Sequence, residues 1–138
     1  MKSNDLVVNK IWARSGSVTV VPNHLTDCYV SGEFPLFELD QDRILPGWAK
    51  LLTKWKGFWL ACDEKSQGTS GKNRIKPQQF LSVTIPLPNS ITEQQTIVAR
   101  LDAVTEKARQ VAARLDATEA DAERLLAVRF HETIKEAQ

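Results

Sequence analysis

Short runs rich in β-branched and aromatic residues recur along the first two thirds of the chain. Gly, Pro, Asn and Asp stand between these runs, and such spacing is typical of a compact domain that contains a β-sheet. The predicted strands cover residues 6–11, 17–21, 28–31, 34–39 and 83–85.

Within this β-rich region, one helix with an aromatic face is predicted. Pro46 suits the first position of a helix, where a missing backbone N–H costs little. Apolar residues then follow at three- and four-residue steps: Trp48, Leu51, Leu52, Trp55, Phe58 and Trp59. We expect the tryptophans of this helix to lie in the core rather than to stack on bases. Residues 66–74, with two glycines, predict a loop after it.

A different periodicity begins after Pro88 and predicts one long helix. Ser90 with Glu93, or alternatively Thr92 with Gln95, forms a capping box at its start. Apolar residues then repeat at steps of four and three for about four heptads, which is typical of a coiled coil. A continuous helix over residues 93–136 would be roughly 65 Å long at about 1.5 Å per residue. The predicted contact positions are Ile97, Leu101, Val104, Ala108, Val111, Leu115, Ala122 and Leu125.

A helix of this length has more apolar surface than a domain of this size can cover. The small residues Ala108 and Ala122 permit close approach of a second helix, and the polar Thr118 can help to set register. Pairing with a second chain or domain is therefore expected, and the alternative is a helix that folds back on its own domain. Beyond Leu125 the apolar positions shift to Leu126, Phe130 and Ile134, which indicates a change of contact.

Composition adds a bound on the class of protein. The 138 residues are 25% charged and 42% hydrophobic with a net charge of +1, as in a soluble globular domain with or without an extension. No apolar run approaches the roughly 18 residues of a membrane helix, and the start of the chain does not resemble a signal peptide. We therefore expect a cytoplasmic protein without a membrane partner.

Charge is distributed unevenly. Residues 43–76 hold eight basic residues against two acidic ones, whereas residues 1–42 hold three basic and six acidic residues. A surface that binds a polyanion is therefore expected in the middle of the chain.

Neither a metal site nor a catalytic group is predicted. Cys28, Cys62, His24 and His131 are too scattered for a four-ligand zinc site, and the two thiols are expected to be free and buried. The pair Gly71-Lys72 suggests a phosphate loop, but Ser66 and Asn73 stand where that motif needs Gly and Ser or Thr. We therefore expect no cofactor and no enzymatic activity.

Several segments, in order and spacing, resemble the DNA-specificity subunit of Type I restriction-modification systems. In that family a target-recognition domain ends in a strand similar to residues 85–88, and a Glu-Gln pair then opens a long spacer helix. The matching segments are residues 6–14, 30–37, 68–75, 85–88 and 93–98. Family members usually carry two recognition domains and two spacer helices, so this chain resembles the C-terminal portion of one half of such a subunit.

This resemblance implies a fold and a division of the chain. The expected class is α+β: residues 1–88 form a partial, β-rich DNA target-recognition domain, and residues 89–138 form a long spacer or dimerisation helix. It also implies a protein that selects a double-stranded DNA sequence for methyltransferase and restriction subunits while performing no chemistry itself. Because the family pairs its two spacer helices in antiparallel fashion, we expect a homodimer of that kind.

The predicted DNA-binding residues come from the basic loop and from the end of the first strand: Lys10, Arg14, Lys72, Asn73, Arg74 and Lys76. Lysine and arginine can neutralise phosphates, and an arginine can also contact a guanine edge. The alternative for the loop is that its charges only solvate the surface. The alternative for the whole chain is a truncated assembly or regulatory fragment that acts through its helix and binds little DNA.

Overall fold

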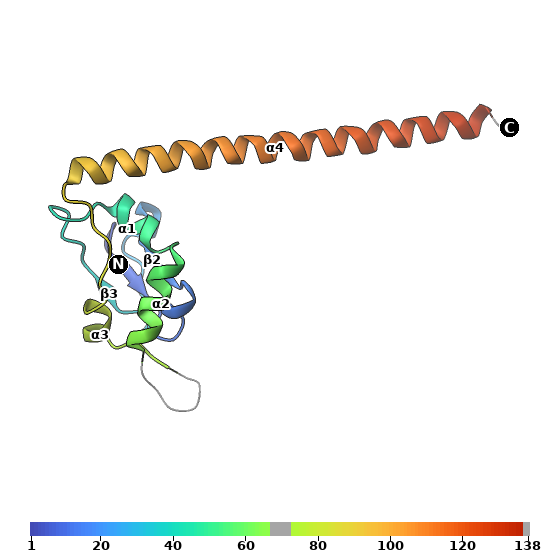
Figure 1. The fold of residues 1–138 in the computed structure, drawn as a ribbon. Helices are drawn as coiled ribbons and strands as arrows, with labels where there is room; N and C mark the ends of the chain where they lie inside the picture. The colour runs from blue at the N-terminus through green and yellow to red at the C-terminus, as the bar shows by residue number, and fades with distance from the viewer. Residues whose placement is uncertain (67–72, 137–138) are drawn as a thin grey trace. The chain divides into compact units, whose positions relative to one another are not determined.

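The computed structural model describes residues 1–66 and 73–136. Among these residues, one antiparallel sheet has the strand order β2-β1-β3 (Figure 1). The central strand β1 (Leu6–Val8) pairs with β2 (Val18–Val20) and β3 (Leu36–Phe37). The helices are α1 (Pro46–Leu52), α2 (Lys56–Lys65), α3 (Pro77–Leu81) and α4 (Ile91–Glu136), with 3-10 turns η1 (Ala13–Ser15) and η2 (Asn23–Leu25). The predicted α+β class with a long C-terminal helix is confirmed.

Two compact units divide the chain. The first is residues 1–98, and the second begins at Ala99, so residues 91–98 of α4 pack with the first unit. This boundary describes packing. The predicted functional division after residue 88 stays a prediction, because packing does not show where a recognition function ends.

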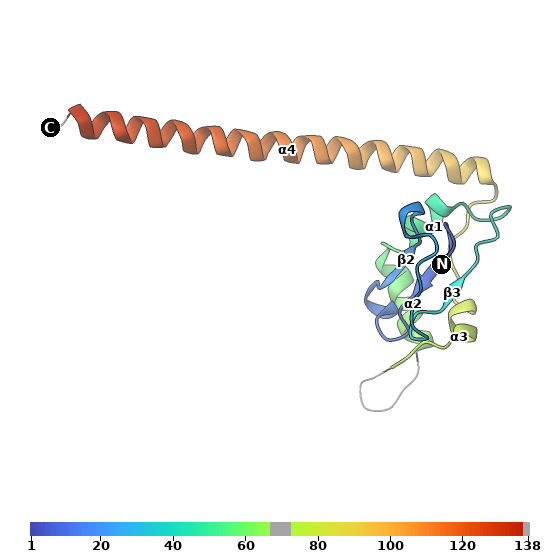
Figure 2. The same cartoon turned by 180° about the vertical axis from the view of Figure 1, so that it is seen from behind.

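The core of the first unit lies between the sheet and two of its helices (Figure 2). Leu6 and Val8 alternate with the less buried Val7, so β1 directs one face inward. Phe58 and Cys62 of α2 pack on this face together with Phe80 of α3. The Phe80 ring lies 4.8 Å from the ring of Phe37 and 6.0 Å from that of Phe58, centroid to centroid. These aromatic contacts fix α3 to the sheet and to α2.

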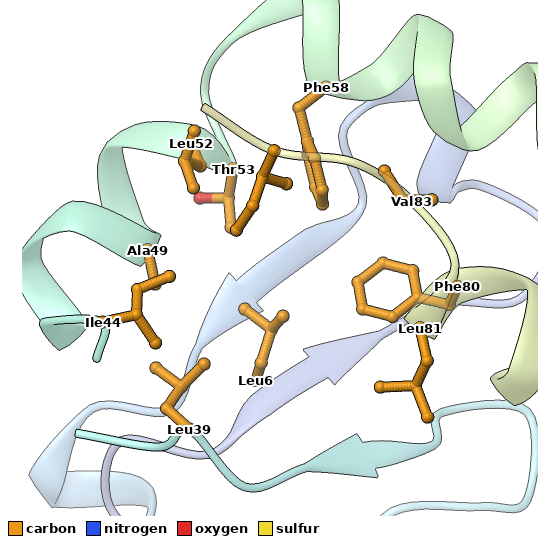
Figure 3. Close-up of a pocket in the computed structure, with 11 residues that line it drawn as sticks. Leu6, Leu39, Ile44, Ala49, Leu52, Thr53, Phe58, Phe80, Leu81 and Val83 are labelled. Atoms are coloured by element: carbon orange, nitrogen blue, oxygen red, sulfur yellow. The ribbon is translucent and has the colours of Figure 1, made fainter. Parts of the chain in front are cut away.

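An apolar pocket of about 170 Å³ opens beside this core (Figure 3). Its wall includes Leu6 of β1, Leu52 of α1 and Phe80 of α3. The wall also includes Thr53, whose hydroxyl donates a hydrogen bond to the backbone oxygen of Lys50 at 2.9 Å. The pocket therefore offers contact for apolar atoms and no titratable group.

The first strand is shorter than predicted because Asn9 ends it. The side-chain oxygen of Asn9 accepts hydrogen bonds from the backbone N–H of Ile11 at 2.9 Å and of Trp12 at 3.1 Å. This asparagine turn replaces ladder bonds and leads into η1. Gly16 ends η1 with a φ of +87°, and a Cβ there would lie 2.6 Å from the Trp59 ring, so this position requires glycine.

The prediction of one aromatic helix over residues 46–59 is wrong, because the chain forms α1 and α2 with a break between them. Pro46 does open α1 at its N-terminal end, as predicted. The break is stabilised by Trp59, whose indole N–H donates to the backbone oxygen of Thr53 at 2.7 Å. Trp55 adopts an extended conformation there, and its ring leaves no room for a Cβ at Gly57.

Two further predicted strands do not form. Residues 28–31 are exposed and follow Asp27, whose φ of +67° turns the chain, and Tyr29 is 99% exposed. Residues 83–85 pack Val83 and Ile85 against the core but are not assigned to a strand. In both places the apolar pattern is present, but a strand also needs a neighbouring strand to pair with.

The start of α4 is fixed by two consecutive residues with different partners. The hydroxyl of Ser90 accepts the backbone N–H of Glu93 at 3.1 Å, and the Glu93 carboxylate accepts that of Asn89 at 3.2 Å. The Ser90 bond is that of the first predicted capping box, whereas the Glu93 carboxylate bonds the residue before Ser90 rather than Ser90 itself. The next residue, Gln94, is 1% exposed: its oxygen accepts from Leu45 N–H at 2.9 Å, and its amide donates to the Arg43 oxygen at 2.8 Å.

Both cysteines are free, but the expectation that both are buried is wrong for Cys28. Cys28 lies in the exposed segment after η2, whereas Cys62 lies on the buried face of α2 and is 0% exposed. Burial raises the pKa of the Cys62 thiol to about 11 because the low-dielectric core disfavours a thiolate.

We predict that one thiol per native chain reacts with an aromatic disulfide reagent at about pH 8. With a pKa of about 11, only about one Cys62 in a thousand is a thiolate at that pH, and it is also shielded from solvent. The measurement is the released chromophore before and after unfolding in concentrated guanidinium chloride. Cys28→Ser should abolish the native reaction, and equal reaction of both thiols in the folded chain would contradict this core.

We predict that Gln94→Ala lowers the free energy of unfolding by about 1–3 kcal/mol, since it leaves Leu45 N–H and the Arg43 oxygen without their partner. Urea unfolding followed by tryptophan fluorescence measures this, because every tryptophan lies in the first unit. The matched control is the exposed neighbour, Gln95→Ala, with an expected change within about 0.5 kcal/mol. Equal effects of the two changes would refute the role of Gln94.

Candidate nucleic-acid interface

Three segments of the first unit meet at Lys10, the residue that follows Asn9. The backbone N–H of Lys10 donates to the oxygen of Glu33 at 3.1 Å, and the Lys10 oxygen accepts from Ile75 N–H at 2.9 Å. Two residues earlier, in β1, Val8 N–H donates to the Pro35 oxygen at 3.1 Å. The main chain thus holds residues 32–35 and 73–75 on either side of residue 10.

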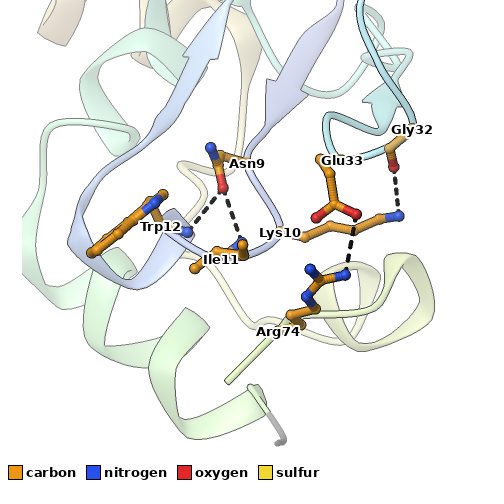
Figure 4. Close-up of polar contacts among 7 residues, drawn as sticks. All are labelled: Asn9, Lys10, Ile11, Trp12, Gly32, Glu33 and Arg74. Atoms are coloured by element: carbon orange, nitrogen blue, oxygen red, sulfur yellow. Dashed lines mark hydrogen bonds and ion pairs between the residues drawn. The ribbon is translucent and has the colours of Figure 1, made fainter. Parts of the chain in front are cut away.

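Side chains reinforce this junction (Figure 4). The ammonium of Lys10 donates to the backbone oxygen of Gly32 at 2.5 Å, and Nη1 of Arg74 lies 3.1 Å from Oε1 of Glu33. We call Lys10, Gly32, Glu33 and Arg74 the β1-end cluster. It brings together residues from three of the segments on which the family resemblance was based.

The cluster combines two cations with one carboxylate at the surface. The side chains of Arg74 and Glu33 are 51% and 42% exposed. An ion pair in such contact with water contributes at most about 1 kcal/mol. Arg74 can therefore exchange its contact with Glu33 for another acceptor at small cost, whereas Lys10 is partly buried and holds the Gly32 loop.

The structure places the other predicted DNA-binding residues differently. Arg14 of η1 lies 3.7 Å from the Asp63 carboxylate of α2 and has a further interaction, so it packs toward α2. Asn73 is partly buried, and Lys76 has an exposed side chain just before α3. Lys72 lies outside the described residues. The assignment of these residues to DNA stays a prediction.

Glu33 is the member of the cluster that sequence analysis missed. A single glutamate in an acidic N-terminal third carries no distinguishing pattern. The available signal was its position within residues 30–37, one of the segments that resemble the specificity family.

The tryptophans divide between core and surface. Trp59 packs against the core, and Trp48 is partly buried with its indole N–H donating to the Pro86 oxygen at 3.1 Å. The expectation of a core position is wrong for Trp55, which is 50% exposed. Trp12, whose ring points away from the β1-end cluster in Figure 4, is 54% exposed.

In the single chain, α4 exposes the apolar stripe that its heptads predicted. Ile97 is partly buried in the first unit, whereas Leu101, Val104, Val111, Leu115 and Leu125 are 44–66% exposed, and Ala108 and Ala122 are exposed too. Leu126 and Phe130 further along are 71% and 69% exposed. A stripe of this size is typical of an interaction surface.

Polar residues of α4 form pairs one turn apart. Glu106 accepts two hydrogen bonds from Arg109 at 2.9 and 2.8 Å and one from Gln110 at 2.9 Å, and the Arg109 guanidinium beside it lowers the pKa of the Glu106 carboxyl. Arg124 pairs with Asp121 and Arg129 with Glu132. Such pairs between neighbouring turns add a small, salt-sensitive support to an exposed helix.

The described part of the chain contains neither a metal-binding cluster nor a helix that could span a membrane. Among residues 1–66 and 73–136, no group of three or more His, Cys, Asp or Glu side chains is placed to hold a metal ion. No helix in those ranges combines the length and the apolar character needed to cross a membrane.

Among known proteins, similarity to this chain is found at the level of the fold. No family profile matches the chain, and no curated protein matches it significantly. The fold is similar to that of the HsdS subunit from Thermoanaerobacter tengcongensis, with a TM-score of 0.71 and 22% sequence identity. The match covers 91% of this chain and 32% of that chain.

HsdS is the specificity subunit of a Type I restriction system. The resemblance inferred from the sequence segments is therefore confirmed at the level of the fold. The chain spans about a third of the length of that subunit.

Proposed function

We propose that this chain is a DNA-recognition portion of a Type I restriction-modification specificity component. The similarity of fold to HsdS over 91% of the chain carries this proposal. The β1-end cluster supports it, because it gathers basic side chains on the part of the domain where the family-like segments converge.

Within this proposal, the basic residues have distinct roles. Arg74 and Lys76 are exposed and would contact DNA, together with Lys72 and Asn73, which precede them in the sequence. Lys10 positions the Gly32 loop and adds positive charge beside them. Arg14 contributes charge from η1 while paired with Asp63. Contacts to phosphates would position the protein, and contacts to base edges would select the sequence.

The component performs no chemistry and needs no cofactor. Its partners are duplex DNA and the methyltransferase and restriction subunits, which would act on the sequence it selects. Such a complex works in the cytoplasm. The family resemblance implies each of these properties for this chain.

The exposed stripe of α4 favours a second candidate function. In it the chain is an assembly or regulatory fragment that pairs through its helix and binds little DNA. Both functions include a homodimer with antiparallel helices, because pairing would cover Leu101, Val104, Val111 and Leu115. DNA binding is what separates the two.

We predict that the chain binds a random-sequence duplex with an affinity that falls steeply as salt rises. Each neutralised phosphate releases counterions and contributes about −0.9 to the log-log slope. Changing Lys72, Arg74 and Lys76 together to Ala should flatten the slope by up to about three units. Fluorescence anisotropy of a labelled duplex at several salt concentrations measures both affinity and slope.

The matched control removes the same number of charges from α4, at Lys107, Arg109 and Arg114, and should leave the slope nearly unchanged. Equal flattening by both triple variants would reject the loop as the DNA-binding surface. Absence of binding at low salt, with the dimer intact, would leave the assembly fragment as the function.

We predict a dimer of twice the 15.5 kDa chain mass in light scattering at micromolar concentration. Leu101→Asp and Leu115→Asp should each dissociate it, because a carboxylate would enter an apolar contact. Ala113→Asp places the same group on the opposite side of the helix and should leave the dimer intact. A monomeric wild-type chain would disprove the pairing.

A further inference from the structure

Glu33 and Arg74 form an asymmetric pair. Oε1 of Glu33 receives the hydrogen bond from Nη1 of Arg74, at 3.1 Å. Oε2 is shielded from solvent and accepts no hydrogen bond from the described residues. The carboxylate thus has one oxygen buried without a partner among the described residues and the other joined to a guanidinium that is about half exposed.

The backbone limits the freedom of both partners. Glu33 follows Gly32, whose oxygen is bound by the Lys10 ammonium, and the Glu33 oxygen itself accepts from Lys10 N–H. Arg74 precedes Ile75, which is 1% exposed and donates its N–H to the Lys10 oxygen. The two side chains therefore start from backbone positions that share one anchor, residue 10.

An arginine held in this way differs from one on a free loop. Its guanidinium has five N–H donors in a planar fork, and the contact with Glu33 occupies one of them among the described residues. This one exposed contact biases the orientation of the guanidinium without locking it, and donors remain for a second acceptor. A guanine edge offers two acceptors, O6 and N7, that match such a fork.

The Glu33 carboxylate also repels anionic ligands that approach Arg74. A phosphate that approaches Arg74 meets the negative charge of Glu33 within hydrogen-bonding distance of the same guanidinium. A neutral guanine edge does not carry this penalty. Glu33 thereby disfavours contact of Arg74 with the DNA backbone more than contact with a base.

We propose that Glu33 is a positioning residue. It favours contact of Arg74 with a guanine edge over nonspecific contact of Arg74 with a DNA phosphate. This inference rests on the proposed function, since it presumes that the chain binds duplex DNA. It adds one base class to the specificity of the site and assigns a role to an acidic residue within a basic surface.

The test compares Glu33→Gln with Glu38→Gln, which removes the same charge from an exposed position just after β3. Two probes are used: a random-sequence duplex at several salt concentrations, and a pool of randomised duplexes whose bound fraction is sequenced. For Glu33→Gln we expect tighter binding to the random duplex and a slope steeper by about 0.9, because Arg74 gains a phosphate. Guanine preference at one position should fall about tenfold.

A third variant separates positioning from loss of structure. Glu33→Gln combined with Arg74→Ala should lose the added slope, since the added phosphate contact belongs to Arg74. If Glu33→Gln merely disordered the loop, binding to the random duplex would not become tighter.

The outcomes distinguish this inference from the function on which it rests. If wild-type chain binds DNA but Glu33→Gln and Glu38→Gln behave alike, or if wild type shows no guanine preference, the role of Glu33 is rejected and the DNA-binding function stands. If wild-type chain binds no duplex at low salt, the proposed function itself fails.

Discussion

The main-chain hydrogen bonds of Lys10 are the constraint on which the candidate site depends. One residue donates to Glu33 and accepts from Ile75, so the loop before β3 and the segment before α3 are both fixed to the end of β1. Ile75 is buried in the core at this point, which anchors the junction from inside. Because the anchor is backbone, the side chains around it can be polar and exposed without loss of geometry. A binding surface can be built there at little cost to the stability of the core.

A second constraint acts where α4 begins. The Glu93 carboxylate accepts the backbone N–H of Asn89 just before the helix, and Gln94 turns inward to bond both an acceptor and a donor of residues 43–45. Those residues lead directly into α1, and Leu45 is its N-cap. A buried amide needs both partners, so the first turn of α4 and the entry to α1 form one hydrogen-bonded unit. The Glu-Gln pair of the family resemblance thus has two separate physical tasks in this chain.

The two compact units differ in how far they bury their apolar residues. The first buries Leu6, Val8, Phe58 and Phe80 around a small sheet and keeps one apolar pocket. The second is helix alone, and its apolar stripe has no partner among the described residues. Ion pairs one turn apart support the helix but do not cover that stripe. Covering it requires a second apolar surface.

The sequence by itself determined the local features: the capped start of α4, its heptad stripe and the opening of α1 at Pro46. These follow from contacts within a few residues, which a pattern records. It also singled out Lys10 and Arg74, through charge and resemblance. Only the tertiary structure decided that Glu33 lies beside Arg74, that Arg14 turns to Asp63, that Trp59 stabilises a break between α1 and α2, and that residues 28–31 and 83–85 are not strands. The contacts of Glu33 and Arg14 depend on partners distant in the chain, and the contact of Trp59 depends on a break in the helix, so the periodicity of one segment does not record them.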